Sequence, residues 1–314
     1  MKTTKQENST DLVLWLAFAS VYVLWGSTYL ALRFVLESMP PFLMAAFRFL
    51  SAGTIMLLLA RIGKHAWPSA KEMKNSALVG FLLLVVGNGG VVWAEQYINS
   101  GITALLITIE PVWVVLLLWM RSNEHKPSPV VWIGIFLGIA GMLVLIGPSS
   151  IGEVEQLNPW GVLALLISSL SWAIGSVFAL RMQLPSSSSM NTCFQMLSAG
   201  FMFLLISLGR AEWNGFELSS ITMHSWLGFL YLLIFGSLIG YTSYGYIVKK
   251  APPTSVSTYA YVNPVIAVFL GWWLGNERVG TQTILAALLL VSAVVLILTK
   301  PDWKLNFTIK KIRS

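Results

Sequence analysis

Residues 110–124, EPVWVVLLLWMRSNE, and residues 263–277, NPVIAVFLGWWLGNE, carry the pattern that decides the fold. In each stretch a polar residue is followed by Pro-Val, and an apolar block then leads to a glutamate, Glu124 in the first stretch and Glu277 in the second. Similar segments at a fixed separation indicate an internal duplication. The chain is therefore predicted to consist of two related halves.

Weaker matches extend this repeat along the chain at a shift of about 150 residues. They pair Trp25 with Trp172, Ala31-Leu32-Arg33 with Ala179-Leu180-Arg181, Gly80-Phe81-Leu82 with Gly228-Phe229-Leu230, and Tyr97-Ile98 with Tyr246-Ile247. The matches keep their order and differ only by small insertions, as diverged copies of one unit do.

The composition places both halves in a lipid bilayer. Hydrophobic residues make up 56% of the chain and charged residues 11%, whereas soluble domains average about 45–50% and about 25%. Because lipid offers the backbone no hydrogen-bond partners, a span of roughly 20 apolar residues must be a helix. The prediction is an all-α membrane protein with ten transmembrane helices. The ten apolar blocks are 12–32, 40–60, 77–97, 101–120, 130–147, 159–180, 190–209, 225–247, 255–275 and 281–299.

Five of these blocks fall in each half, so the second half crosses the membrane in the opposite sense and the repeats are inverted. Inverted repeats allow one site at the middle of the membrane to open alternately to either side, which favours a transporter. The predicted division is a cytoplasmic N-terminal segment at 1–11, a first repeat at 12–147, a periplasmic linker at 148–158, a second repeat at 159–299 and a basic cytoplasmic tail at 300–314.

The distribution of basic residues predicts the orientation. With the N-terminus inside, sixteen of the twenty Lys and Arg residues lie on cytoplasmic segments, Arg33, Arg210 and Arg278 lie on the other side, and Arg48 lies within a span. Cytoplasmic loops carry the excess of Lys and Arg. Both termini are therefore predicted to be cytoplasmic in a multi-pass protein of the cell inner membrane. The net charge of +7 then reflects topology in the bilayer and not a nucleic-acid partner.

An ordered set of short motifs resembles a known family. The set comprises Trp25-Gly26-Ser27-Thr28, Pro40-Pro41 followed by Arg48-Phe49, Gly87-Asn88, and the pairs Pro111 to Glu124 and Pro264 to Glu277. Over about residues 14–298 these motifs resemble the EamA family of the drug/metabolite transporter superfamily. The resemblance implies ten helices with both termini inside, an inverted five-plus-five repeat, and export of metabolites or amphiphilic compounds, without specifying a substrate.

Arg48 and Glu110 are the two ionisable residues that lie clearly inside predicted spans, where charge is costly and usually functional. Both lie at a similar depth, at about 1.5 Å per residue from the outer helix ends. In one interpretation Glu110 binds a proton or cation beside the substrate, and Arg48 balances its charge or meets an anionic group. In the other the two form a structural ion pair. Pro111 favours the functional interpretation of Glu110, because proline frees a backbone carbonyl.

Five further residues are candidates for the wall of a substrate cavity. Asn263 corresponds to Glu110 in the repeat and shares a helix face with Tyr259, four residues earlier. Asn88 lies mid-span, where its amide either lines the cavity or bonds to a neighbouring helix. Trp25 and Trp172 lie deeper than most other tryptophans, and they form either an aromatic substrate site or part of the core.

The remaining chemistry argues against an enzyme or a metal centre. Cys193 is the single cysteine, so a disulfide framework or a cysteine metal cluster is not expected. Aspartyl, zinc and Ser-His chemistries lack their groups at depth, because the Asp and His residues lie outside or at the edges of the blocks: Asp11, Asp302, His65, His125 and His224.

We therefore expect a secondary transporter, an exporter of small metabolites or of amphiphilic, cationic compounds. Protons are a candidate coupling ion, and no cofactor or metal is expected. The alternatives are a passive channel-like facilitator and a membrane sensor without active transport. Neither the substrate nor the oligomeric state follows from the sequence.

Overall fold

The computed structural model describes residues 3–121, 128–146, 157–251, 256 and 258–299. Within these ranges every regular element is a helix, which confirms the predicted all-α class. Eight helical runs are long and apolar enough to cross a membrane. They are Leu12–Leu36, Pro41–Ile62, Ala70–Ala94, Ser100–Met120, Pro129–Ile146, Pro159–Ala179, Ser188–Gly209 and Met223–Val248. Two further helices, α14 (Tyr259–Trp273) and α15 (Thr281–Thr299), lie within the predicted blocks 255–275 and 281–299.

Several runs are built from more than one helical piece. The first half contains α1 (Thr3–Ser20), the π-helical stretch η1 (Val21–Trp25), α2 (Gly26–Leu36), α3 (Pro41–Ile62), α4 (Ala70–Gly80), the π-helical η2 (Phe81–Asn88), α5 (Gly89–Ala94), α6 (Ser100–Ile107), α7 (Glu110–Arg121) and α8 (Pro129–Ile146). The second half contains α9 (Pro159–Ala179), α10 (Ser188–Gly209), the 3₁₀ turn η4 (Leu218–Ser220), α11 (Met223–Tyr231), the π-helical η5 (Leu232–Tyr241), α12 (Thr242–Lys250), α14 (Tyr259–Trp273) and α15 (Thr281–Thr299). Glu124, most of the linker at 148–158 and the tail at 300–314 lie outside the described residues.

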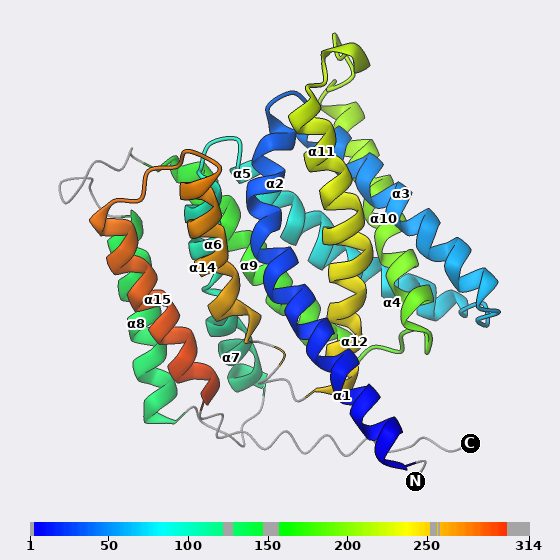
Figure 1. The fold of residues 1–314 in the computed structure, drawn as a ribbon, viewed down its shortest axis with the longest axis horizontal. Coiled ribbons are helices and arrows are strands. Elements are labelled where there is room, and N and C mark those ends of the chain that lie inside the picture. The colour runs from blue at the N-terminus through cyan, green and yellow to red at the C-terminus, as the bar shows by residue number, and fades with distance from the viewer. Residues whose placement is uncertain (1–2, 122–127, 147–156, 252–255, 257, 300–314) are drawn as a thin grey trace.

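The second helix of each half, α3 and α10, pack along each other as an antiparallel pair (Figure 1). A Cβ atom built on Gly53 would lie 2.9 Å from the backbone nitrogen of Leu197, and one built on Gly200 would lie 2.7 Å from the backbone nitrogen of Leu50. In the repeat Gly53 corresponds to Gly200 and Leu50 to Leu197, so the two contacts are equivalent. Glycine permits this close approach of backbones, as small residues do between membrane helices.

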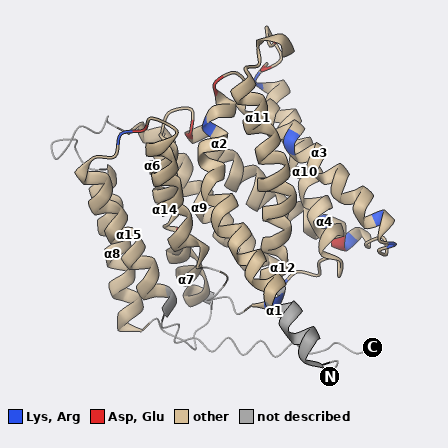
Figure 2. Ribbon diagram, viewed as in Figure 1, with Lys and Arg blue, Asp and Glu red and all other residues tan. Residues whose placement is uncertain are grey.

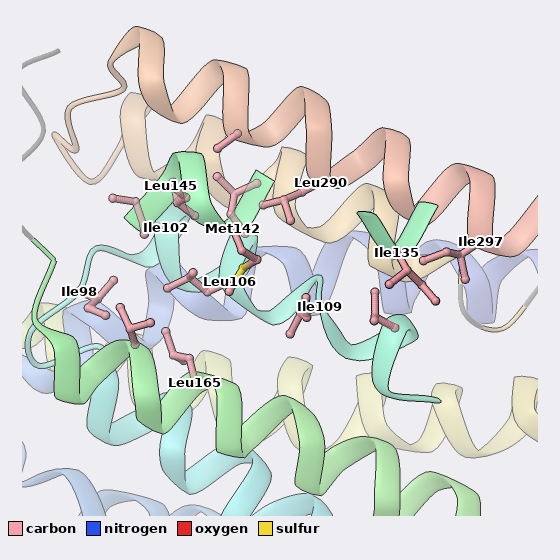
Figure 3. Close-up of a cluster of buried hydrophobic side chains, with 14 of the residues drawn as sticks. Ile98, Ile102, Leu106, Ile109, Ile135, Met142, Leu145, Leu165, Leu290 and Ile297 are labelled. Atoms are coloured by element: carbon pink, nitrogen blue, oxygen red, sulfur yellow. The ribbon is translucent and has the colours of Figure 1, made fainter. Parts of the chain in front are cut away.

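The fifth helix of each half, α8 and α15, form a second antiparallel pair, because Gly134 lies against Ile297 whereas Gly141 lies against Leu290. Figure 3 shows Leu290 and Ile297 from α15 facing side chains of α8 in the largest buried hydrophobic cluster. Corresponding helices that run antiparallel are what an inverted repeat requires.

The outward surfaces of the bundle are apolar. On α8, for example, Ile133, Phe136 and Leu143 are exposed, and most charged residues gather near the two ends of the bundle, with tan helices between them (Figure 2). This is the surface of a multi-pass membrane protein, in which lipid covers the apolar band. Cys193 is buried in the core.

Candidate functional site

A cavity of about 130 Å³ lies between the two halves. Its walls come from η1, α2, α3, η2, α5, α6 and α7 of the first half and from α9, α10, η5 and α14 of the second. A buried water needs about 10–15 Å³ of such space, so the cavity has room for several waters. Polar groups on its walls can therefore be hydrated inside the helical bundle.

All seven residues singled out in the sequence line this one cavity. They are Trp25, Arg48, Asn88, Glu110, Trp172, Tyr259 and Asn263. The first four belong to the first half and the last three to the second. The packing of the halves therefore brings positions that are distant in the sequence to one place.

Glu110 lies at a break in its transmembrane run. The helix α6 ends at Ile107 and α7 begins at Glu110, and between them the amide of Ile109 bonds the carbonyl of Leu106, three residues back, at 3.4 Å. Pro111 lacks the N–H that would continue an α-helical ladder across the break. The Glu110 carboxylate therefore lies at the first turn of a new helix, where the helix dipole favours negative charge. In the second half, Pro264 remains inside α14 without a break.

Arg48 and Glu110 occupy the cavity wall without forming an ion pair. Arg48 Nε donates to Ser237 Oγ at 2.8 Å, and its guanidinium lies 4.9 Å from the centre of the Phe49 ring. Among the described residues no hydrogen bond reaches the Glu110 carboxylate, and the ion pairs within 4.0 Å lie elsewhere, at Arg33–Glu277 and at Arg210–Glu212. The interpretation of Arg48 and Glu110 as a structural pair thus finds no contact to support it.

An aromatic cluster surrounds Trp25. The ring centre of Trp25 lies 5.9 Å from that of Trp172 and 5.7 Å from that of Tyr259, both edge to face, and 5.1 Å from that of Tyr244. Glu110 lines the same cavity as Trp25, Trp172 and Tyr259, and it lies within electrostatic range of Tyr244 and Tyr259. A carboxylate beside several aromatic faces is an environment that stabilises an organic cation.

The two asparagines differ in how their amides are satisfied. Asn88 Oδ1 is buried and has no hydrogen-bond partner among the described residues. Asn263, with its amide turned to suit its neighbours, donates to the backbone oxygens of Tyr22 at 3.1 Å and Tyr259 at 3.3 Å. Asn88 therefore has a free acceptor for a ligand or a water, whereas Asn263 ties α14 to η1.

The three π-helical stretches all contribute to the cavity wall, and hydrophobic patterning does not reveal them. Trp25 comes from η1, Asn88 from η2 and Ser237 from η5. Trp25 Nε1 donates to the backbone oxygen of Gly236 within η5 at 3.2 Å, which uses a carbonyl in the irregular turn. Short π-helical turns occur frequently at functional sites.

Sequence reasoning missed several polar residues of the wall, among them Tyr29, Ser237 and Tyr241. Tyr29 had a usable signal, because it lies one helical turn beyond Trp25 on the same face. Ser237 and Tyr241 had none, since their orientation depends on the π-helical path of η5.

A helical membrane protein of two inverted halves, with a polar and aromatic cavity between them and a broken helix at its acidic residue, has the architecture of a transporter. The chain matches the model of the EamA-like transporter family over residues 12–147 and 159–299. It belongs to that family.

Relatives named as transporters cover nearly the whole chain. It is similar to the inner membrane transporter YedA of Escherichia coli K12, with 38% identity over 90% of this chain and 89% of the relative. The transporter YoaV of Bacillus subtilis is 25% identical over 89% of this chain and 94% of its own length. A protein of known crystal structure shares the fold, with a TM-score of 0.62 and 19% identity over 91% of this chain and 96% of that one. These names favour transport over catalysis.

Proposed function

We propose that the chain is a secondary transporter of the cell inner membrane that exports small metabolites or amphiphilic, cationic compounds by alternating access. The observation that carries this proposal is the cavity between the halves, where the Glu110 carboxylate lies beside the Trp25 cluster without a protein partner among the described residues. A buried carboxylate with no partner is costly in a membrane, and a positively charged ligand or a proton removes that cost.

The walls of the cavity favour a substrate with a cationic group and an apolar body. The cationic group would lie between Glu110 and the rings of Trp25 and Tyr259, held by charge and by cation–π attraction. Asn88 Oδ1 would accept a hydrogen bond from the same substrate. Arg48, held away from Glu110 by Ser237, would meet a polar or anionic group at the other part of the cavity.

The acidic site also supports coupling to protons. Substrate and proton would compete for Glu110, so that inward proton movement drives outward movement of the substrate. In this proposal ten helices cross the membrane, both termini are cytoplasmic, and the face shown at the top of Figure 1 is periplasmic. The sixteen-to-three division of basic residues supports that orientation.

The test is transport by the purified protein in proteoliposomes. Amino acids, nucleobases and organic cations are screened with and without an imposed pH gradient, and empty liposomes serve as the control. We expect one class to move against its concentration gradient only when the pH gradient is present. Flux that only follows the concentration gradient would replace the transporter by a passive facilitator, and binding without flux would point to a sensor.

A further inference from the structure

A polar closure joins the two halves at the face shown at the top of Figure 1. The side chain of Arg33, in the last turn of α2, donates through Nη1 to Asn99 Oδ1 at 2.8 Å and to Glu277 Oε1 at 2.7 Å. Glu277 follows α14 and belongs to the second half, whereas Arg33 and Asn99 belong to the first. The contact therefore holds the halves together above the cavity.

Glu277 also caps the N-terminal end of α6. Its Oε1 accepts hydrogen bonds from the backbone nitrogen and the hydroxyl of Ser100, at 2.8 and 2.7 Å, and its Oε2 accepts one from the backbone nitrogen of Gly101 at 3.0 Å. With Arg33 these donors occupy both carboxylate oxygens. A negatively charged acceptor at a helix N-terminus is favourable, so both oxygens of the Glu277 carboxylate have hydrogen-bond donors that stabilise its charge.

Glu95 lies in the same region, but its carboxylate lacks such donors in the part of the chain that the structure describes. It directly follows α5, beyond the end of the run Ala70–Ala94, and 7% of its surface is exposed. Both of its carboxylate oxygens are buried and lack a hydrogen-bond partner among the described residues. A charge on Glu95 would lie within electrostatic range of Arg33 and Glu277. The single guanidinium of Arg33 would then face two carboxylates, those of Glu95 and Glu277.

The described helices that pack most closely on α5 offer Glu95 no compensating cation nearby. From α2, Tyr29 lies within electrostatic range and is also part of the cavity wall. The elements packed most against α5 are α9, η2 and α3. The first two carry no ionisable side chain, and α3 carries Arg48 in the cavity and Arg61 at its far end. A metal ion would need several oxygen ligands, but the oxygens of Glu277 are already in use.

We propose that Glu95 is a proton-binding site of this closure, protonated while Arg33, Glu277 and the start of α6 are held together and ionised when they separate. Burial raises the pKa of the Glu95 carboxyl well above its ordinary value, the Glu277 charge raises it further, and Arg33 lowers it. Opening would hydrate the carboxyl and return its pKa toward the ordinary range.

The sign of the pH effect follows from this difference. The closed state binds one more proton than the open state between the ordinary and the raised pKa, so closure weakens as pH rises through that window. The closed-to-open ratio falls by at most about tenfold per pH unit, because one proton is involved. The inference rests on the proposed alternating access, but it needs neither the substrate nor the coupling role of Glu110.

The test follows access to the cavity without any substrate. A cysteine replaces Ala104, which lines the cavity on α6, in a Cys193→Ala background, and a membrane-impermeant maleimide is added to spheroplasts or to inside-out vesicles at several pH values. The labelling rate from the face of the closure is divided by the rate measured in the same protein carrying Glu95→Gln, because thiol reactivity itself rises with pH. We expect this ratio to rise with pH. Glu95→Gln itself should label slowly.

Glu212→Gln is the matched control, because Glu212 lies at the same face and its carboxylate already accepts the backbone N–H groups of Phe42 and Leu43. It should keep the pH dependence. An unchanged pH dependence in Glu95→Gln would overturn the proposal, and so would a dependence on sodium at constant pH. If the proteins carrying Ala104→Cys insert poorly, infrared spectra of purified protein without that cysteine decide instead: at neutral pH the band of a protonated carboxyl should remain in Glu110→Gln and be absent when Glu95→Gln is added to it. Failure of transport with this band intact would count only against the proposed function.

Discussion

Arg48 and Glu110 line the same cavity without contacting each other. Arg48 is held by Ser237 and Phe49, whereas Glu110 begins α7 and receives no hydrogen bond from the described residues. An ion pair would have neutralised both groups. Held apart, each keeps its charge available to a substrate or a proton, and the two can be altered independently.

Replacing Glu110 by Gln should abolish flux that is driven by a pH gradient, while the protein remains folded. The amide keeps the shape but cannot take up or release a proton. Breaking a buried ion pair costs about 3–5 kcal/mol, but Arg48 is not the partner here, so this loss of stability is not expected. The changes in the free energy of unfolding caused by Glu110→Gln and by Arg48→Gln should add up in the double variant. Flux under an imposed pH gradient and thermal unfolding in detergent measure the two effects, and wild-type proton-driven flux in Glu110→Gln would remove the coupling role.

Trp25→Ala and Trp172→Ala should each weaken substrate affinity with near-normal folding. Loss of one desolvated aromatic face costs about 0.5–2 kcal/mol, which corresponds to a rise in the dissociation constant of about 2- to 30-fold. Trp160→Ala is the control, because Trp160 is 68% exposed at the start of α9. Binding isotherms of the substrate found in the screen supply the measurement. Unchanged affinity in both cavity variants would assign these rings to packing.

Gly53→Ala and Gly200→Ala should each destabilise the pair α3–α10 by about 1–3 kcal/mol through overpacking. Trimming the facing leucine to alanine should not restore stability, because the added Cβ meets a backbone nitrogen. Gly209→Ala, also in α10, is the control: no atom lies within 4 Å of its added Cβ, so it should be neutral or gain about 0.5–1 kcal/mol. Thermal unfolding of the purified variants tests the comparison, and equal effects at all three positions would refute it.

Cysteine labelling should show the proposed topology. His65→Cys, just beyond α3, should react only from the cytoplasm, and Ser220→Cys, in η4, only from the periplasm. His65 is preferred to Ser69, because Ser69 forms a capping box with Glu72 at the start of α4. Ser122 and Ser150, which would serve the same purpose, lie outside the described residues. Reaction of His65→Cys from the periplasm would reverse the orientation.

The helical class and the pairing of the halves could be predicted because they depend on features that sequence records directly, namely block length and repeated motifs. The polar cavity residues could be found for a similar reason: an ionisable or amide group inside an apolar block is costly unless it faces a hydrated cavity or a polar partner. The partner of Arg48 could not be predicted, since depth along the membrane normal does not specify rotation about a helix axis. Glu95 was missed because it lies at the end of a block, where a charge normally reaches water.

The π-helical stretches allow the cavity wall to tolerate single-residue deletions, which the regular α-helices do not. A residue deleted from an α-helix turns everything beyond it by about 100°, which would rotate buried faces into lipid. In η2 or η5 the turn already holds a surplus residue, so a one-residue deletion would restore regular α-helical bonding there. Only the stretch itself would then present a different set of side chains to the cavity, while the outer part of the run, the loops and the packing of α3 on α10 stayed in place. Single-residue deletions in these two stretches are thus a route by which relatives of this chain can acquire new substrates without rebuilding the bundle.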